Sequence, residues 1–232
     1  MEKKIDRRRT YLIMGDTETC NTRVDENGKL DMRDVLVYDF GFAVCDKHGR
    51  VYEEYSFIIK EVFFGMKDLM ESAYYADKLP QYYEEIRNGK RKVVSLYEVK
   101  QILSNVMKEY DTNIFVAHNA RFDDNALKVT QRYITKSKYR YFLPFGTEIW
   151  DTMKMANDTI CKQKAYRKFC EENGYLTKNN QVRKTAEVIY RYITKNNDFI
   201  ESHTGLEDVM IEKEILAYCF RQHKAMRKKL YA

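Results

Sequence analysis

The sequence predicts an α/β fold: a mixed five-stranded sheet, made of three antiparallel strands and further parallel strands, flanked by helices. Two observations predict this class. Three strand-like runs come first, and two further short apolar runs then alternate with amphipathic helices. The chain has 232 residues, of which 44% are hydrophobic, so residues 1–232 are long enough to form one domain of this kind.

The first three strands lie before residue 61. YLIMGD (11–16) is a continuously apolar run that ends in an acid, which is typical of a strand buried on both faces. Residues 34–46 and 51–60 follow as strands, and DKHG (46–49) is a good hairpin turn between them. We therefore expect the chain to open as a three-stranded antiparallel unit.

Helices and short strands alternate in the rest of the chain. Ser95 with Glu98 predicts a capping box, and Asn119 and Asp151 are good N-caps for two later helices. The expected elements are, in order, a helix at 95–110, a strand at 113–119, a helix at 120–134, a strand at 148–150, a helix after Asp151, and a last helix from about 205 to 227.

Two segments show no pattern that points to a function, and we expect helical insertions there, near 61–93 and 160–200. The first should be irregular, because Pro80 and NGK (88–90) interrupt it. The second should hold two or three helices.

The composition favours an intracellular protein with an anionic partner. A net charge of +6 and a pI of about 8.9 suit nucleic acid. The five cysteines are scattered without a C-x-x-C pair, as expected for reduced thiols. We find no signal peptide, and no apolar run approaches the roughly 18 residues that a membrane span needs. We expect a cytoplasmic protein without a membrane partner.

An acid pair follows the first apolar run, because Asp16 and Glu18 lie two residues apart. Side chains two apart on a strand share one face, and two acids side by side repel unless a cation bridges them. An isolated pair of this spacing is more often two solvated acids beyond the end of a strand. A cation site therefore requires further carboxylates at the same place.

Two other segments supply such carboxylates. Asp123 and Asp124 fall in the first turn of the helix at 120–134, where acids also favour the helix dipole, and we expect Asp124 to be solvated. Near the C-terminus, Thr204 with Glu207 predicts a capping box and a helix that begins at Gly205.

The last helix places an acid and a histidine together. Asp208 lies in its first turn, and His203 lies on the loop before it. A loop histidine beside a carboxylate is mobile and titrates near neutral pH. Four carboxylates from three segments suit two hard divalent cations bound through oxygen, the usual device for in-line attack on a phosphodiester.

Three motifs carry a family resemblance. DTET (16–19), HNARFD (118–123) and HTGLED (203–208) resemble, in order, the exonuclease motifs of the DnaQ-like 3′–5′ exonucleases of the DEDDh type. That family includes polymerase proofreading subunits, RNase T and oligoribonuclease, and the resemblance extends from about residue 10 to 222. In the sister DEDDy class a tyrosine lies four residues before the last acid. Thr204 holds that position here, which favours the histidine type.

The resemblance implies a ribonuclease-H-like fold and a 3′–5′ exonuclease that uses two divalent metal ions, Mg²⁺ or Mn²⁺. Asp16, Glu18 and Asp208 would hold one ion, and Asp16 with Asp123 the other. His203 would take the proton from the attacking water. The product would be a nucleoside 5′-monophosphate from the 3′ end of DNA or RNA.

Substrate contacts and partners are less defined by the sequence. Thr19, Asn119 and Phe122 are candidates for holding the terminal nucleotide. A polymerase or other replication partner would fit the family, and the oligomeric state stays open. Two alternatives remain: a non-catalytic module that binds single strands, and another ribonuclease-H-like nuclease such as a resolvase or integrase.

Overall fold

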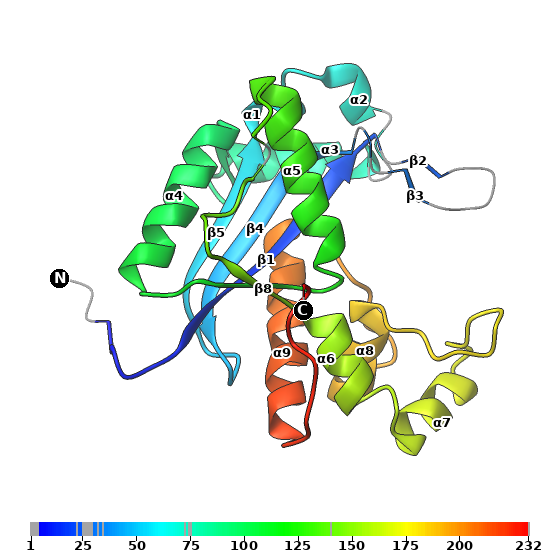
Figure 1. Ribbon diagram of the computed structural model, residues 1–232. Helices are drawn as coiled ribbons and strands as arrows, with labels where there is room; N and C mark the ends of the chain where they lie inside the picture. The colour runs from blue at the N-terminus through cyan, green and yellow to red at the C-terminus, as the bar shows by residue number, and fades with distance from the viewer. Residues whose placement is uncertain are drawn as a thin grey trace.

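A six-stranded mixed sheet forms the centre of the structure (Figure 1). The structure is a computed structural model that describes residues 5–21, 23–24, 30–31, 33, 35–71, 73, 76–139 and 141–231. The strand order is β6-β5-β4-β1-β7-β8. The strands are β1 (Tyr11–Cys20), β4 (Leu36–Asp46), β5 (Val51–Ile59), β6 (Lys92–Val94), β7 (Ile114–Ala117) and β8 (Glu148–Asp151).

The strand directions confirm the predicted mixed sheet. β1 pairs antiparallel with β4, and β4 pairs antiparallel with β5. β7 is parallel to β1, and β8 is parallel to β7. The predicted number of five strands is wrong, because β6 adds to β5 as a sixth. Its three residues are too few to show an alternating pattern in the sequence. A separate two-stranded sheet joins β2 (Arg23–Val24) and β3 (Leu30–Asp31).

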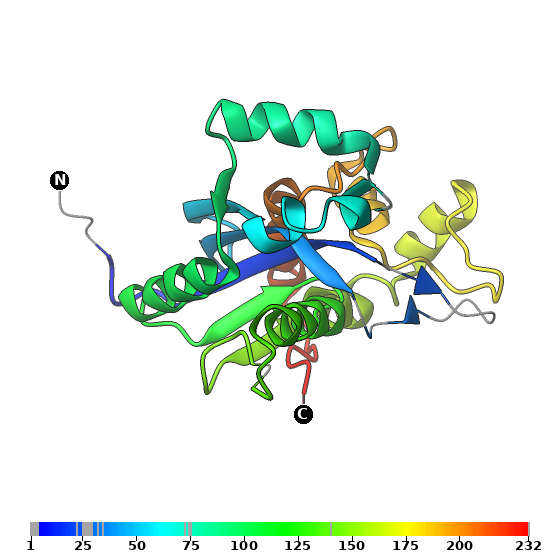
Figure 2. The same ribbon diagram turned by 90° about the horizontal axis from the view of Figure 1, so that it is seen from above.

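Helices cover both faces of the sheet. Figure 2 shows α4 (Leu96–Glu109) and α5 (Arg121–Thr135) on one side and α9 (Gly205–Arg221) on the other. Successive residues of β1 alternate between the two cores: Ile13 packs on the α4–α5 side, whereas Leu12 and Met14 pack on the α9 side. The α9 side also holds α6 (Thr152–Thr159) and α8 (Ala186–Thr194).

The two segments that we expected to be insertions, residues 61–93 and 160–200, both contain helices. Residues 60–87 form α1 (Lys60–Phe63), α2 (Lys67–Glu71), the 3-10 helix η1 (Ala76–Lys78) and α3 (Leu79–Arg87). Pro80 does not interrupt a helix there: it lies in the first turn of α3, where a proline removes no helical hydrogen bond. Asn88 and Gly89 end α3, as expected. Residues 160–200 hold α7 (Lys164–Glu172) and α8.

Two predicted helix caps are confirmed and one is wrong. Ser95 and Glu98 form the capping box of α4, and the Asp151 carboxylate accepts from the backbone N–H of Met153. Asn119 does not cap α5 with its side chain. It takes a left-handed conformation (φ 62°), and Ala120 is the N-cap residue.

The last helix is shorter than predicted. α9 ends at Arg221, six residues before the expected limit, and His223 is left-handed (φ 51°). The chain then turns back along β8, where the N–H of Leu230 donates to the carbonyl of Ile149 at 2.8 Å. In the part of the chain that the structure describes, helices with the length and apolar character of a membrane span are absent.

Backbone contact between β4 and α9 brings the start of α9 down onto the sheet. Gly41 on β4 pairs with Asp16 on β1. A Cβ atom at Gly41 would lie 2.1 Å from the backbone nitrogen of Leu206, and one at Gly205 would lie 2.7 Å from the backbone nitrogen of Gly41. Glycine at both positions therefore permits the first turn of α9 to lie directly over the centre of the sheet.

We expect Gly41→Ala to destabilise the protein by about 1–3 kcal/mol or more, because the clash is with backbone and no side chain can rotate to relieve it. Urea unfolding of both proteins measures the loss. Gly89→Ala is the control, since its added methyl meets nothing within 4 Å and reports only the strain of a positive φ. Equal stability losses in the two variants would contradict the packing argument.

Candidate active site

The acid pair lies within β1 and faces α9. β1 continues to Cys20, so Asp16 and Glu18 are not solvated acids beyond the end of a strand. In the alternation of β1 their side chains lie on the same face as those of Leu12 and Met14, which pack on the α9 side. A β-bulge lies just after Glu18. Burial and the charges of neighbouring acids raise the pKa of Asp16 and of Glu18 well above the ordinary values.

Asp123 reaches the same place from α5. Its Oδ1 accepts from the Thr17 hydroxyl at 2.8 Å and from the Thr17 backbone N–H at 3.2 Å, so α5 is tied to β1 between the two acids. Burial raises the pKa of Asp123 to about 7 despite these hydrogen bonds. The expectation that Asp124 is solvated is wrong: it is 2% exposed, pairs with Lys128 and accepts from the Tyr231 hydroxyl.

His203 and Asp208 complete the group. One ligand atom from each of Glu18, His203 and Asp208 lies within 4.8 Å of the others. Asp208 accepts from the Ser202 hydroxyl at 3.2 Å, and burial together with the charge of Glu201 raises its pKa to about 8. His203 has a left-handed backbone (φ 50°), and its side chain is 35% exposed. The structure therefore brings together the acids and the histidine that the sequence singled out.

The imidazole of His203 lies in an environment that favours its neutral form. Burial and the nearby charge of Lys78 lower its pKa, and the Lys78 ammonium donates to the carbonyl of Ser202 beside it. Glu201 lies 3.9 Å from the Nδ1 atom of His203. A neutral imidazole with a partly exposed edge is the form that can accept a proton.

Asp39 holds the start of α9 in place. The predicted capping box is present only as a side-chain contact, in which the Thr204 hydroxyl donates to Glu207 at 2.8 Å. The backbone N–H of Gly205, at the first position of α9, instead donates to Asp39 on β4 at 3.0 Å. The same oxygen of Asp39 accepts from the Tyr82 hydroxyl at 2.8 Å.

Arg91 links this cap to the first insertion. Its side chain is 0% exposed, and it donates to Asp39 at 2.8 Å, to Glu207 at 2.9 Å and to Glu85. A buried arginine is stabilised only by such paired contacts. Arg91 thus joins β4 and α3 to the first turn of α9, which carries Asp208.

Sequence reasoning missed a further carboxylate, Glu212. It lies four residues after Asp208 on α9, and residues at this spacing share one helix face. Its carboxylate is buried and accepts from the backbone N–H of His118 at 3.1 Å. Burial and the charges of Asp123 and Asp208 raise its pKa well above the ordinary value. The spacing from Asp208 was the signal that could have found it.

The donor set fits divalent cations. Several carboxylates lie close enough to raise one another's pKa, and the Oδ2 atom of Asp16 is buried without a hydrogen-bond partner in the described part of the chain. A buried carboxylate oxygen without a partner is costly unless the group is protonated or a cation occupies the position. Oxygen ligands of this kind suit Mg²⁺ or Mn²⁺.

The three candidates for substrate contacts differ in their surroundings. Thr19 is buried next to the bulge in β1, and Asn119 is exposed, with its N–H donating to Asp151 at 3.1 Å. Phe122 is partly buried and packs against the core on the α4–α5 side. Of the three, Asn119 presents its side chain most openly.

Comparison with known proteins identifies the fold. No family model matches the sequence, and no curated protein matches it. Among solved structures, the nuclease domain of 3'hExo, a DEDDh family member bound to rAMP, superposes with a TM-score of 0.54 at 12% identity. The match covers 94% of this chain and 95% of that one.

Two further structures agree. A full-length 3'-exonuclease has a TM-score of 0.53 at 13% identity, covering 96% of this chain and 87% of its own. E. coli exonuclease I in complex with a dT13 oligonucleotide has a TM-score of 0.52 at 15% identity, covering 90% of this chain and 41% of its own. The chain therefore has the ribonuclease-H-like fold of the DEDDh 3′ exonucleases, as the motifs predicted.

Proposed function

We propose that this protein is a metal-dependent 3′–5′ exonuclease that hydrolyses single-stranded DNA or RNA and releases nucleoside 5′-monophosphates. The observation that carries the proposal is the meeting of Asp16, Glu18, Asp123, Asp208 and His203 at one place, from three segments far apart in the sequence. The fold supports it, since the solved structures that it matches are exonucleases.

The acids would hold two divalent ions. Asp16, Glu18 and Asp208 would bind one, and Asp16 with Asp123 the other, so Asp16 is the shared ligand. When bound, the ions would lower the pKa of the attacking water and stabilise the charge on the leaving 3′ oxygen. The fixed hydrogen bonds from Thr17 to Asp123 orient that carboxylate before any ion binds.

His203 would act as the general base. Its partly exposed ring is near Glu18 and Asp208, and its lowered pKa keeps it neutral at physiological pH. Ser202 and Lys78 fix the loop that carries it, because Lys78 donates to the carbonyl of Ser202 and the Ser202 hydroxyl donates to Asp208. The proton would leave to solvent through the exposed edge of the ring.

A non-catalytic module on the same fold is the second candidate. It would be favoured by a missing or misplaced acid, and the four acids of the motifs all lie at the site. A degradation assay on 3′-labelled and 5′-labelled strands of DNA and RNA, with Mg²⁺, Mn²⁺ or EDTA, separates the two. Stepwise loss of the 3′ label that needs metal supports the enzyme, and intact strands under every condition would leave only binding.

We expect the metal-free protein to lose stability as the pH rises from 6.5 to 8. Burial raises the pKa of Asp123 to about 7 and that of Asp208 to about 8. In this range the folded chain still holds protons that the unfolded chain has released, so the free energy of unfolding falls with rising pH. The lowered pKa values of His118 and His203 oppose this change, but unfolded histidines are only about half protonated at pH 6.5 and neutral by pH 8, so their effect is smaller than that of the two acids.

Urea unfolding in EDTA at both pH values measures this change. Adding Mg²⁺ or Mn²⁺ at about 100 times its dissociation constant should restore roughly 2.7 kcal/mol at the higher pH. A protein whose stability in EDTA is flat over this range, and which metal does not stabilise, would count against a cation site at these acids.

A further inference from the structure

Exposed aromatic side chains gather beside α5. The segment after that helix carries Tyr139, Tyr141 and Phe145, which are 81%, 69% and 108% exposed, and Tyr231 near the C-terminus is 52% exposed. Three of these rings, Tyr141, Phe145 and Tyr231, line a hollow of about 410 Å³, together with Leu143, Ile149 and residues of α5. Large rings are normally buried, and a group of exposed ones marks an interaction site.

Positive charges are interleaved with these rings. The ammonium of Lys128 lies 5.9 Å from the ring centre of Tyr141 and 5.6 Å from that of Tyr231. Lys100, on α4, donates to the carbonyl of Tyr141 at 2.7 Å. Asp124, the acid that lines the hollow, accepts from the Tyr231 hydroxyl and pairs with Lys128, so it offsets the charge of that lysine.

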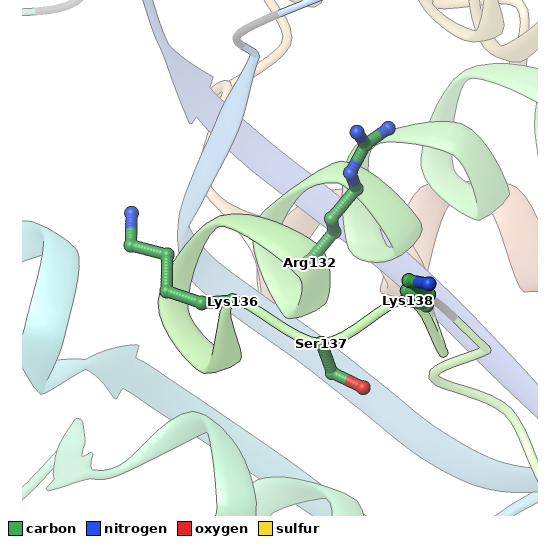
Figure 3. A pocket seen from close by; sticks show the side chains of 4 residues that line it. All are labelled: Arg132, Lys136, Ser137 and Lys138. Atoms are coloured by element: carbon green, nitrogen blue, oxygen red, sulfur yellow. The ribbon is translucent and has the colours of Figure 1, made fainter.

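The charge continues along α5 to its C-terminal end. A second hollow there is lined by Arg132, Lys136, Ser137 and Lys138, on the last turns of α5 and the loop after it (Figure 3). The ammonium of Lys136 also lies 4.2 Å from the ring centre of the exposed Tyr133. We call the two hollows with their rings and cations the α5 surface.

The α5 surface starts next to the candidate active site. Asp124 lines the first hollow and directly follows Asp123, the acid that meets β1. From Asp123 to Lys136 the helix rises about 20 Å at about 1.5 Å per residue. That length matches roughly six nucleotides at the about 3.4 Å spacing of a stacked strand.

We infer that the α5 surface binds single-stranded nucleic acid upstream of the 3′ end that is being hydrolysed; this inference rests on the proposed function. Cations neutralise phosphates, and exposed rings stack on unpaired bases, which a duplex does not offer. A protein partner or a second copy of the chain would need no such alternation of rings and cations.

The first test measures binding without hydrolysis. Fluorescence anisotropy in EDTA gives the Kd of labelled oligothymidylate of about 15 nucleotides for wild type, Tyr141→Ala and Phe145→Ala. Each substitution should weaken binding about 5- to 150-fold. Tyr97→Ala is the matched control, because Tyr97 is 70% exposed on α4 and contributes to neither hollow. Lys138→Gln should reduce the slope of log K against log salt concentration by about 1, the effect of losing one phosphate contact.

Folding does not confound this test, because the ring of Phe145 is fully exposed and its removal leaves no cavity. Binding by Tyr141→Ala and Phe145→Ala equal to that of Tyr97→Ala would overturn the inference. So would a wild-type dimer in sedimentation that becomes monomeric in Phe145→Ala with unchanged DNA binding, since the surface would then join two copies.

A second measurement separates this inference from the proposed function. The kcat/KM of Phe145→Ala should fall on long strands and stay at the wild-type value on the p-nitrophenyl ester of thymidine 5′-monophosphate, which carries no upstream nucleotide to contact the α5 surface. Absence of hydrolysis by wild type would refute the proposed exonuclease and still leave the anisotropy result valid. Hydrolysis of long strands that is equal in wild type and Phe145→Ala, with equal binding, would refute the surface alone.

Discussion

We expect Asp16→Asn to abolish the proposed nuclease activity, by at least about 10³-fold, while the fold and the proposed single-strand binding persist. Asp16 is the acid proposed to serve both metal ions, and its Oδ2 atom is buried without a partner in the described residues. A neutral amide cannot replace a shared carboxylate ligand, whose loss costs several kcal/mol of transition-state stabilisation. Burial already favours the protonated carboxyl of Asp16, so an amide of the same shape should fit and even stabilise the metal-free protein.

Cleavage rates, anisotropy and urea unfolding check the three parts of this prediction. Asp68→Asn is the control, because Asp68 is an exposed acid on α2. Asp124 is unsuitable as a control, since it is buried and paired with Lys128. An Asp16→Asn protein that keeps more than a small fraction of the wild-type rate would remove Asp16 from the role of shared ligand.

The candidate site was predictable because its parts are local patterns. Asp16 and Glu18 share a face through the strand alternation, and Asp208 falls in the first turn of a helix whose start the sequence marks. The three motifs form one site as soon as the strand and helix ends that carry them lie close together in the fold. Alternation and helix starts are properties of a few neighbouring residues, so the sequence displays them directly.

The support of the site was not predictable, because it depends on contacts between distant segments. Arg91 joins Asp39, Glu85 and Glu207 across 52, 6 and 116 positions of the sequence. Nothing near Arg91 in the sequence distinguishes it from the exposed Lys90 beside it. The first insertion, which carried no recognisable motif, supplies this buried arginine and therefore fixes the start of α9.

The error at Asp124 has a similar physical origin. Acids in a first helical turn are usually solvated, and the sequence offered no reason to exclude this for Asp124. The chain after α9, expected to be helical to about residue 227, instead returns along β8 and brings Tyr231 onto Asp124. Because the predicted helix extended too far, the sequence did not show that Tyr231 contacts and helps to bury the carboxylate of Asp124.

If His203 is the proposed general base, we expect His203→Ala to lower the rate of hydrolysis by about 10²–10⁴-fold without preventing metal binding. Proton removal then passes to hydroxide in bulk water, so the residual rate climbs with pH. The wild-type rate should instead become flat above the pKa of the histidine. Free imidazole added to His203→Ala should restore part of the rate, since the ring position is 35% exposed and open to solvent.

Metal affinity decides between the remaining roles of His203. Its ligand atom lies within 4.8 Å of those of Glu18 and Asp208, so it could also be a metal ligand. Titration with Mn²⁺ distinguishes the two, because a general base leaves the affinity nearly unchanged, whereas a ligand takes part of it away. His48→Ala, an exposed turn histidine, is the control for both measurements. A stable His203→Ala protein with wild-type turnover and the wild-type pH profile would show that HTGLED is a helix start beside an incidental histidine.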